Sequence, residues 1–209
     1  MKNIDQDSLK ENGFQILENL LSLSTITSFQ NISNQFKEQP VSIRKNVFGS
    51  SEKIRHYFKA IESTLNSRGF NCKMTPYCFY LEKTEKKNWP LQFHQDTNLP
   101  SYLNLNAKEI EAWLKNGFWV RVNLDRNDKN TGAIKVIPKS HLNGKNSTFD
   151  KKMSVFIDAN QGDIVLFKPL LYHGSDRMTK KWERRVFQCF FLEVSNLNLE
   201  SFSSTELLK

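Results

Sequence analysis

The first third of the chain carries apolar residues at helical spacing. Between Ser51 and Gly69 they recur every three or four positions, at Ile54, Phe58, Ile61 and Leu65. This spacing predicts a helix with one apolar face, capped by Ser50 or Ser51 and followed by Gly69. Three elements are predicted before it: a short helix from Asp7 or Ser8 to about Gly13, a strand over Phe14–Leu17, and a helix from Ser24 to Gln39 stopped by Pro40.

After Gly69 the pattern changes to the alternation of strands. Tyr77, Phe79 and Leu81 alternate with other residues inside Phe70–Lys83, and Leu91 and Phe93 lead into a strand that carries His94. A small inserted helix is predicted over Lys108–Lys115. Six later segments have the composition of strands: Phe118–Leu124, Ala133–Ile137, Ser154–Ile157, Asp163–Phe167, Leu170–His173 and Arg185–Val194.

Helices followed by about eight strands predict a mainly β fold with flanking helices, a double-stranded β-helix of the jelly-roll or cupin kind. A chain of 209 residues suffices for one domain with a substantial core, and it contains no internal repeat or low-complexity linker. We therefore expect a single domain over 1–209, with a helical part (1–69), a jelly-roll core (70–195) and a polar tail (196–209).

The charge of the chain narrows its partners only slightly. A net charge of +8 and a pI of about 9.3 could attract nucleic acid, anionic lipid or an acidic substrate. The lysines are scattered, however, which is typical of solvated loops and disfavours nucleic-acid binding. No apolar run approaches the ~18 residues of a membrane span. The start lacks a signal-peptide pattern, and the odd set Cys72, Cys78 and Cys189 is typical of reduced thiols, so we expect a cytoplasmic protein without a membrane span.

The segment Asn88–Thr97 contains the first candidate chemistry. His94 and Asp96 are two residues apart, and on a strand such residues point to the same side. Two histidines and one carboxylate on one face of an octahedron form the site of non-haem Fe(II) oxygenases. A His-x-Asp tripeptide alone is weak evidence, because most are ordinary surface residues.

The third ligand would come from the remaining histidines. His56 lies in the predicted helix and His141 follows Pro-Lys-Ser, whereas His173 ends an apolar run and precedes Gly174 and Ser175. That position suits a metal ligand at a strand end as well as it suits a simple turn residue. Arg184 follows eleven residues later, at the start of the last strand, where a buried guanidinium could hold a carboxylate in a bidentate manner.

Several ordered blocks run along nearly the whole chain: Glu11–Leu17, Phe79–Thr84 with Asn88–Trp89 and His94–Thr97, Asn130–His141, Gly162–Val165, and Leu170–Ser175 followed by Arg184. Together they resemble the phytanoyl-CoA dioxygenase family of Fe(II)- and 2-oxoglutarate-dependent oxygenases. Thr131 and Lys139, in the block Asn130–His141, depart from that family's usual pattern.

The resemblance implies the roles of the site residues. His94, Asp96 and His173 would bind Fe(II), and Arg184 would hold the distal carboxylate of the cosubstrate 2-oxoglutarate. Arg185 is adjacent and points to the opposite face of the strand, so only one of the two arginines can hold the carboxylate, and which of them faces the cosubstrate stays open. Further contacts to the cosubstrate are expected from the three residues Thr97, Ser175 and Arg121, the last at a place where many relatives have Trp.

The expected activity is hydroxylation of a small molecule by O2, with release of succinate and CO2. The carboxylate of Asp96 favours hydroxylation over halogenation, which would need a small residue there. A nucleic-acid demethylase of the same superfamily would carry a second Arg six residues after Arg184, where this chain has Phe190. A non-catalytic jelly-roll binding protein is the other alternative.

The basic segment Arg177–Arg185 is either a site for an anionic substrate tail or a solvated loop. The substrate, the role of the inserted segment Lys108–Lys115 and the oligomeric state stay open at this stage.

Overall fold

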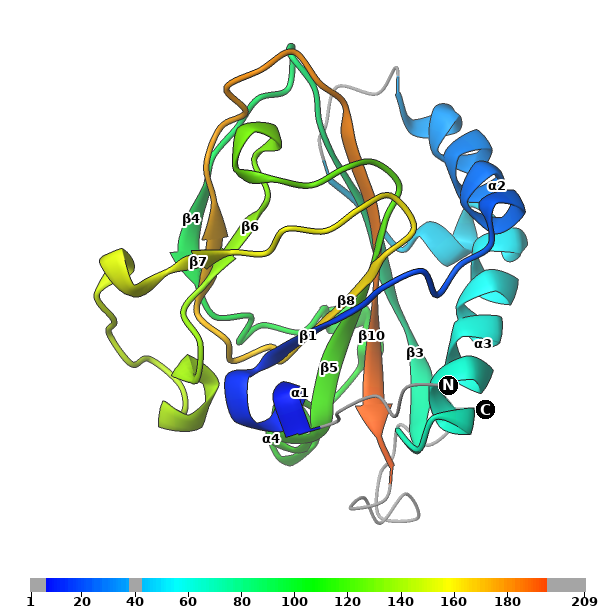
Figure 1. The fold of residues 1–209 in the computed structure, drawn as a ribbon. Helices are drawn as coiled ribbons and strands as arrows, with labels where there is room; N and C mark the ends of the chain where they lie inside the picture. Colours follow the sequence, from blue (N-terminus) through cyan, green and yellow to red (C-terminus); the bar gives the residue numbers. More distant parts are fainter. Residues whose placement is uncertain (1–6, 38–42, 195–209) are drawn as a thin grey trace.

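Two antiparallel sheets face each other in the computed structural model, which describes residues 7–37 and 43–194 (Figure 1). The larger sheet has six strands in the order β1 (Phe14–Leu17), β8 (Ile164–Phe167), β5 (Gly117–Asn123), β10 (Arg184–Glu193), β3 (Cys72–Lys83) and β2 (Ile43–Lys45). The smaller has four, in the order β4 (Leu91–His94), β9 (His173–Ser175), β6 (Ile134–Val136) and β7 (Val155–Phe156).

The helices α2 (Leu23–Ser33) and α3 (Glu52–Ser67) cover the outer face of the larger sheet (Figure 1). The predicted stripe on α3 is buried there, and Gly69 follows the helix with φ +90°. Two short helices complete the fold: α1 (Asp7–Asn12) before β1, and α4 (Ala107–Asn116), which confirms the predicted inserted helix. Trp113 of α4 stacks on Phe190 of β10 at 6.0 Å, so α4 packs against the opposite face of the same sheet.

Strand alternation divides the interior into two apolar clusters. On β5, Phe118, Val120 and Val122 pack with Phe29 of α2 and with α3, in the cluster between the sheet and the helices. The intervening Trp119 belongs to the cluster between the two sheets. Because successive side chains of a strand point to opposite faces, one six-stranded sheet serves both layers.

Some predicted elements are wrong or differ in their bounds. The strand expected over Leu170–His173 is a turn at residues 168–171, closed by the peptide N–H of Leu171 donating to Lys168 O at 3.0 Å, and β9 begins only at His173. The helix expected over Ser24–Gln39 ends at Ser33 and continues as a 3-10 turn over Asn34–Phe36. Its predicted stop at Pro40 and the tail 196–209 lie outside the described residues. Strand β2 was not predicted.

In the described part of the chain, no helix has both the length and the apolar character needed to cross a membrane.

Candidate active site

His94, Asp96 and His173 meet in the space between the two sheets. The Nε2 atom of His94 lies 3.2 Å from Asp96 Oδ1, and the Nε2 atom of His173 lies 3.6 Å from Asp96 Oδ2. One potential ligand atom from each residue lies within 4.8 Å of the others. Two histidines and one carboxylate whose donor atoms lie this close together are the donor set of the non-haem iron triad.

Backbone carbonyls fix both imidazole rings. His94 Nδ1 lies 2.8 Å from Gln92 O, and His173 Nδ1 lies 2.8 Å from Leu171 O. A carbonyl can only accept, so each Nδ1 carries a proton, and the Nε2 atom of each ring lies toward Asp96. A histidine held in this way through Nδ1 is oriented to bind a metal through Nε2.

The local backbone brings these residues together in a way that differs from the simple strand expected. β4 ends at His94, and the pairing with β9 is irregular between Leu91 and His94. Such an irregularity turns the side chain that follows it, and both Leu91 and His94 line the same cavity. Asp96 lies beyond the strand, where its peptide N–H donates to Pro169 O at 2.8 Å. Its carboxylate Oδ2 accepts the indole N–H of Trp119 at 2.8 Å.

The electrostatics of the three ligands favour a bound cation. Burial alone would raise the pKa of Asp96, but His173, His94 and Trp119 lower it overall, so the carboxylate is ionised. Burial lowers the pKa of His173 and keeps its imidazole neutral. Burial alone would lower the pKa of His94, but the hydrogen bond to Asp96 raises it overall. An ionised carboxylate beside two imidazoles is the donor set of Fe(II), and a bound cation would take the place of the proton between His94 and Asp96.

The cavity around the ligands has a volume of about 280 Å³. Its polar wall, apart from the three ligands, consists of Arg121, Ser175, Arg184 and Gln188. The rest of the wall is apolar and aromatic: Ile43, Tyr77, Phe79, Leu81, Trp89, Leu91, Ile134 and Phe167.

Two arginines of this wall carry buried charge without an acidic partner. Arg121 and Arg184 form no ion pair with a carboxylate in the described part of the chain, and Arg121 NH2 and Arg184 Nε have no hydrogen-bond partner there. Arg121 NH1 donates to Gln188 Oε1 at 3.1 Å, and Arg184 NH1 donates to Gly132 O at 2.5 Å. Burial lowers the pKa of Arg184 to about 10 and that of Arg121 well below its usual value. Both charged forms are therefore destabilised until an anion lies beside them.

The two candidate arginines, Arg184 and Arg185, are neighbours on β10 and point to opposite faces of the sheet. Arg184 lines the cavity, whereas Arg185 is on the helix-facing side of the sheet. There its Nε and NH2 donate to the two oxygens of Asp125 at 2.9 and 2.8 Å, and NH1 donates to Ser33 of α2 at 3.3 Å. Arg185 is therefore already paired with the carboxylate of Asp125, and Arg184 is the arginine available to a ligand.

Of the three other residues expected to contact the cosubstrate, two line the cavity and one does not. Ser175 and Arg121 line the cavity as predicted, but Thr97 does not: its peptide N–H donates to Gln95 O at 3.0 Å in a turn beside the cavity. Sequence reasoning missed Trp119, Gln188 and Lys83. Each lies on a strand at a position whose alternation faces the other sheet, and this was the signal that could have found them.

A family model described as phytanoyl-CoA dioxygenase (PhyH) matches residues 60–186. The chain is also 30% identical over 70 residues to the dioxygenase himG of Aspergillus japonicus. That match covers 34% of this chain and 22% of himG, so the chain corresponds to only a part of that protein's length.

Solved structures with this fold include SnoK and HygX. The α-ketoglutarate-dependent carbocyclase SnoK of nogalamycin biosynthesis has a TM-score of 0.73 at 16% identity, over 91% of this chain and 85% of SnoK. HygX of Streptomyces hygroscopicus, solved with nickel and 2-oxoglutarate, has a TM-score of 0.66 at 12% identity, over 92% of this chain and 88% of HygX. These likenesses confirm the predicted jelly-roll fold.

The family model spans more than half of the chain and includes His94, Asp96, His173 and Arg184. By this match, the chain belongs to the phytanoyl-CoA dioxygenase family.

Proposed function

We propose that this chain is an Fe(II)- and 2-oxoglutarate-dependent dioxygenase that hydroxylates a small molecule. In the balanced reaction, substrate R–H, O2 and 2-oxoglutarate give R–OH, succinate and CO2. One O2 atom enters the hydroxyl group and the other enters succinate.

One observation carries the proposal: the triad His94, Asp96 and His173 shares a single cavity with two buried arginines that lack an acidic partner. A divalent metal satisfies the triad, and a dicarboxylate satisfies Arg121 and Arg184. 2-Oxoglutarate does both, because its keto acid end can bind the metal while its distal carboxylate accepts hydrogen bonds from a guanidinium. That HygX was solved with iron, and also with nickel and 2-oxoglutarate, supports this choice of ligands.

Each residue of the site has a distinct task. His94, Asp96 and His173 would hold iron, which would supply the oxidising chemistry. Trp119 orients the Asp96 carboxylate through its indole N–H. Arg184 and Ser175 hold the distal carboxylate of 2-oxoglutarate, and Arg121 neutralises the keto acid end. Thr97 has no place in this scheme, since it does not line the cavity.

The wall that reaches solvent indicates the chemistry of the substrate. Ile43 is 40% exposed, and Phe79, Trp89 and Leu91 are half-buried, while Arg121 and Arg184 are buried behind them. We infer that the reacting part of the substrate is apolar. The place of SnoK in nogalamycin biosynthesis supports a small molecule.

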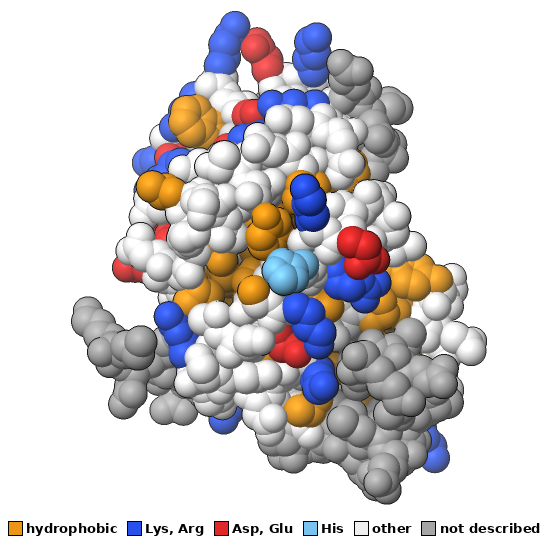
Figure 2. Space-filling model, turned by 90° about the vertical axis from the view of Figure 1, so that its right-hand side faces the viewer, with side chains coloured by type: hydrophobic (Ala, Val, Ile, Leu, Met, Phe, Trp, Pro, Cys, Tyr) orange, Lys and Arg blue, Asp and Glu red, His pale blue; other side chains and the backbone are white. Residues whose placement is uncertain are grey.

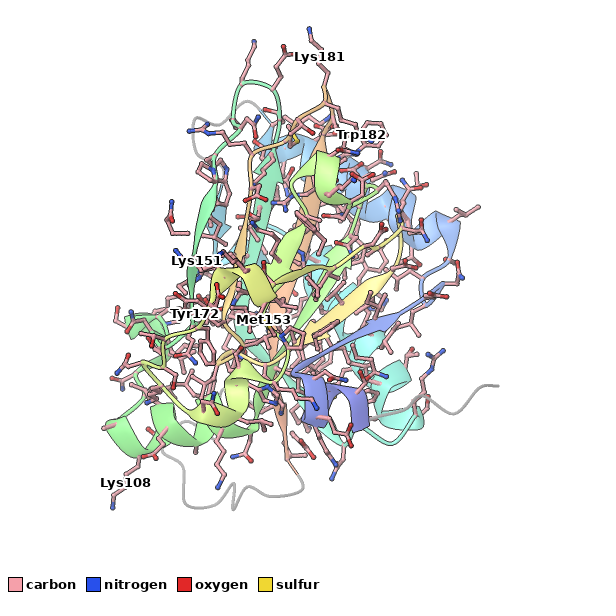
Figure 3. The ribbon with its side chains drawn as sticks, turned by 60° about the vertical axis from the view of Figure 1, so that its left-hand side comes forward. Lys108, Lys151, Met153, Tyr172, Lys181 and Trp182 are labelled. Carbon is pink, nitrogen blue, oxygen red and sulfur yellow. The ribbon has the colours of Figure 1, made fainter. Side chains whose placement is uncertain are left out.

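The net charge of +8 supports an anionic group on that substrate, held outside the cavity. The lysines of the segment Arg177–Arg185 do not line the cavity: Lys180 lies 3.6 Å from Asp128 and Lys181 lies 3.3 Å from Glu85. Figure 3 shows Lys181 pointing outward at the tip of its loop. If turnover is insensitive to salt and to charge reversal at Lys180 and Lys181, an anionic group at this loop is ruled out.

No observation favours a nucleic-acid substrate. Phe190, where such relatives would carry a second Arg, is fully buried against Trp119. On the helix-covered face, lysines and arginines are scattered among acidic and apolar side chains and do not form a continuous basic stripe (Figure 2).

Succinate formation tests the proposed reaction. Purified protein with Fe(II), 2-oxoglutarate and O2 should release succinate slowly even without substrate, and His173→Ala should abolish this release because the metal loses a ligand. His56→Ala is the matched control, since His56 is an exposed histidine of α3 outside the cavity, and it should keep the wild-type rate. Binding of Fe(II) and 2-oxoglutarate without any succinate would instead identify a non-catalytic binding protein.

A further inference from the structure

Lys83 is a fully buried lysine at the end of β3. Within the described residues it forms no ion pair with a carboxylate. Its Nζ donates to Ser175 Oγ at 2.8 Å and to the backbone carbonyl of Asp176 at 2.5 Å, and it lies 5.1 Å from the centre of the Trp89 ring. A buried ammonium held only by neutral groups is costly unless an anion comes close to it.

The contact to Ser175 fixes the direction of that residue's hydroxyl group. A protonated lysine has only donors, so Ser175 Oγ accepts from Lys83 whenever a bound anion keeps that lysine charged. The Ser175 proton is therefore available to another acceptor. Ser175 lines the cavity together with Arg184, so an acceptor in the cavity can take this proton.

Gly132 brings Lys83 and Arg184 to the same place. A Cβ atom at Gly132 would lie 2.9 Å from the backbone Asp176 O and 3.2 Å from Lys83 Nζ, so any larger residue would press on the carbonyl that accepts from the lysine and crowd the lysine itself. The carbonyl of the same residue accepts from Arg184 NH1 at 2.5 Å. Lys83 thus lies directly behind Ser175, and Ser175 and Arg184 line the cavity.

We infer that Lys83 is a positioning residue for the distal carboxylate of 2-oxoglutarate. It orients the Ser175 hydroxyl toward that carboxylate and adds a second positive charge beside Arg184. The inference rests on the proposed function, and it assigns a role to a residue that does not itself line the cavity.

A pair of keto acids separates this role from a merely structural one. 2-Oxopentanoate has the same keto acid end and chain length as 2-oxoglutarate but a methyl group in place of the distal carboxylate. Dissociation constants of both acids are measured from the visible band of their anaerobic Fe(II) complexes. Lys83→Met should weaken 2-oxoglutarate binding about 10-fold, the loss of roughly one charge-assisted hydrogen bond, and change 2-oxopentanoate binding less than about 2-fold.

Lys135→Met is the matched control. Lys135 also binds Asp176, but through the carboxylate at 2.7 Å, and it lies outside the cavity. It should change the affinity for neither acid. Ser175→Ala should reproduce the selective loss, and the double variant Lys83→Met/Ser175→Ala should lose less than the sum of the two single effects, because one side chain acts through the other.

Three outcomes would overturn the inference. Equal weakening of both acids by Lys83→Met would show that the lysine only supports the local structure. An unchanged affinity for 2-oxoglutarate would show that it has no part in binding. If Lys83→Met does not fold, Ser175→Ala decides, and equal weakening of both acids by that variant also overturns the inference. A wild-type protein that forms no band with either acid would overturn the proposed function itself.

Discussion

At the residue scale, Arg184 and Arg185 show how one strand separates two identical side chains. Arg184 faces the cavity with an unpartnered Nε, whereas Arg185 is held by both oxygens of Asp125 on the helix side. The first arginine can serve a ligand, and the second joins β10 to the segment after β5 and to α2. The two arginines differ in role because successive side chains of a strand point to opposite faces of the sheet.

Replacing Asp125 with Ala should therefore affect stability and not ligand binding. The change leaves the buried Arg185 with only its longer ion pair to Glu183, at 3.5 Å, and we expect the free energy of unfolding in urea to fall by about 2 kcal/mol. The dissociation constant of 2-oxoglutarate for the iron-loaded protein should stay within about 2-fold of wild type. A 10-fold loss of affinity with little change in stability would mean that Arg185, and not Arg184, holds the cosubstrate.

Lys83 should make stability depend on pH. Burial, with Arg184 and Arg121 nearby, lowers the pKa of Lys83 from 10.5 to about 7 in the folded protein. Between these two values the unfolded chain binds a proton that the folded chain does not, so stability rises as the pH increases above 7. Urea unfolding of the protein without metal or cosubstrate, at pH 6.5 and pH 9, should show a larger gain for wild type than for Lys83→Met. The same gain in both would mean that the folded lysine keeps its ordinary pKa.

The sequence was informative about residues that are grouped in short blocks. His94 and Asp96 are two residues apart, and Ser175 is two residues from His173. Lys83 could not be found in this way, because its hydrogen bond to Ser175 joins residues 92 positions apart. Trp119 is similarly 23 positions from Asp96. Such contacts exist only after the two sheets have packed.

At the element scale, short irregular segments place the ligands. β9 has three residues and provides both His173 and Ser175, and β4 has four residues with an irregular pairing before His94. The strand predicted over Leu170–His173 is wrong because the turn before β9 alternates like a strand: Leu171 is fully buried, whereas Leu170 and Tyr172 are half-buried. Burial gives the same apolar signal for both, so hydrophobicity alone could not place this boundary.

The turn at Gly132 is the element on which Lys83 and Arg184 both depend. Gly132 has φ +68°, and an added Cβ would lie 2.9 Å from Asp176 O. Gly132→Ala should lower stability by about 1–2 kcal/mol and also weaken 2-oxoglutarate binding, because the Gly132 carbonyl that accepts from Arg184 must shift.

Gly144→Ala is the control for backbone strain. Gly144 has φ +72° and no atom within 4 Å of an added Cβ. It should lose stability without losing affinity for 2-oxoglutarate. Equal affinities for the two variants would show that the position of the Gly132 carbonyl is unimportant for binding.

At the scale of the whole molecule, the six-stranded sheet separates two layers. The supporting layer consists of α2, α3 and the side chains that face them, and the functional layer consists of the cavity and the side chains between the two sheets. Phe58 of α3 packs against the helix-facing side with Phe29, whereas Trp119 and Phe167 face the cavity side. The fold class could be predicted from strand alternation. The order β1-β8-β5-β10-β3-β2 could not, because it joins strands far apart in sequence that carry no local pairing signal.

Damage to the supporting layer should leave the site intact as long as the protein folds. Phe58→Ala removes a fully buried ring, so we expect a loss of about 3–5 kcal/mol in the free energy of unfolding. Below the new unfolding temperature, measured by circular dichroism, the affinity for 2-oxoglutarate should match wild type. A parallel loss of affinity would mean that the helix layer and the cavity are mechanically coupled.

The measurement that tests the account most directly is anaerobic. Fe(II) and 2-oxoglutarate are added to the purified protein, and the weak visible charge-transfer band of the chelate is recorded for wild type, His94→Ala and Arg184→Ala. We predict a band in wild type that disappears in His94→Ala and weakens in Arg184→Ala, because the first variant loses a metal ligand and the second loses the partner of the distal carboxylate. A wild-type protein that retains no metal and shows no band would contradict the account.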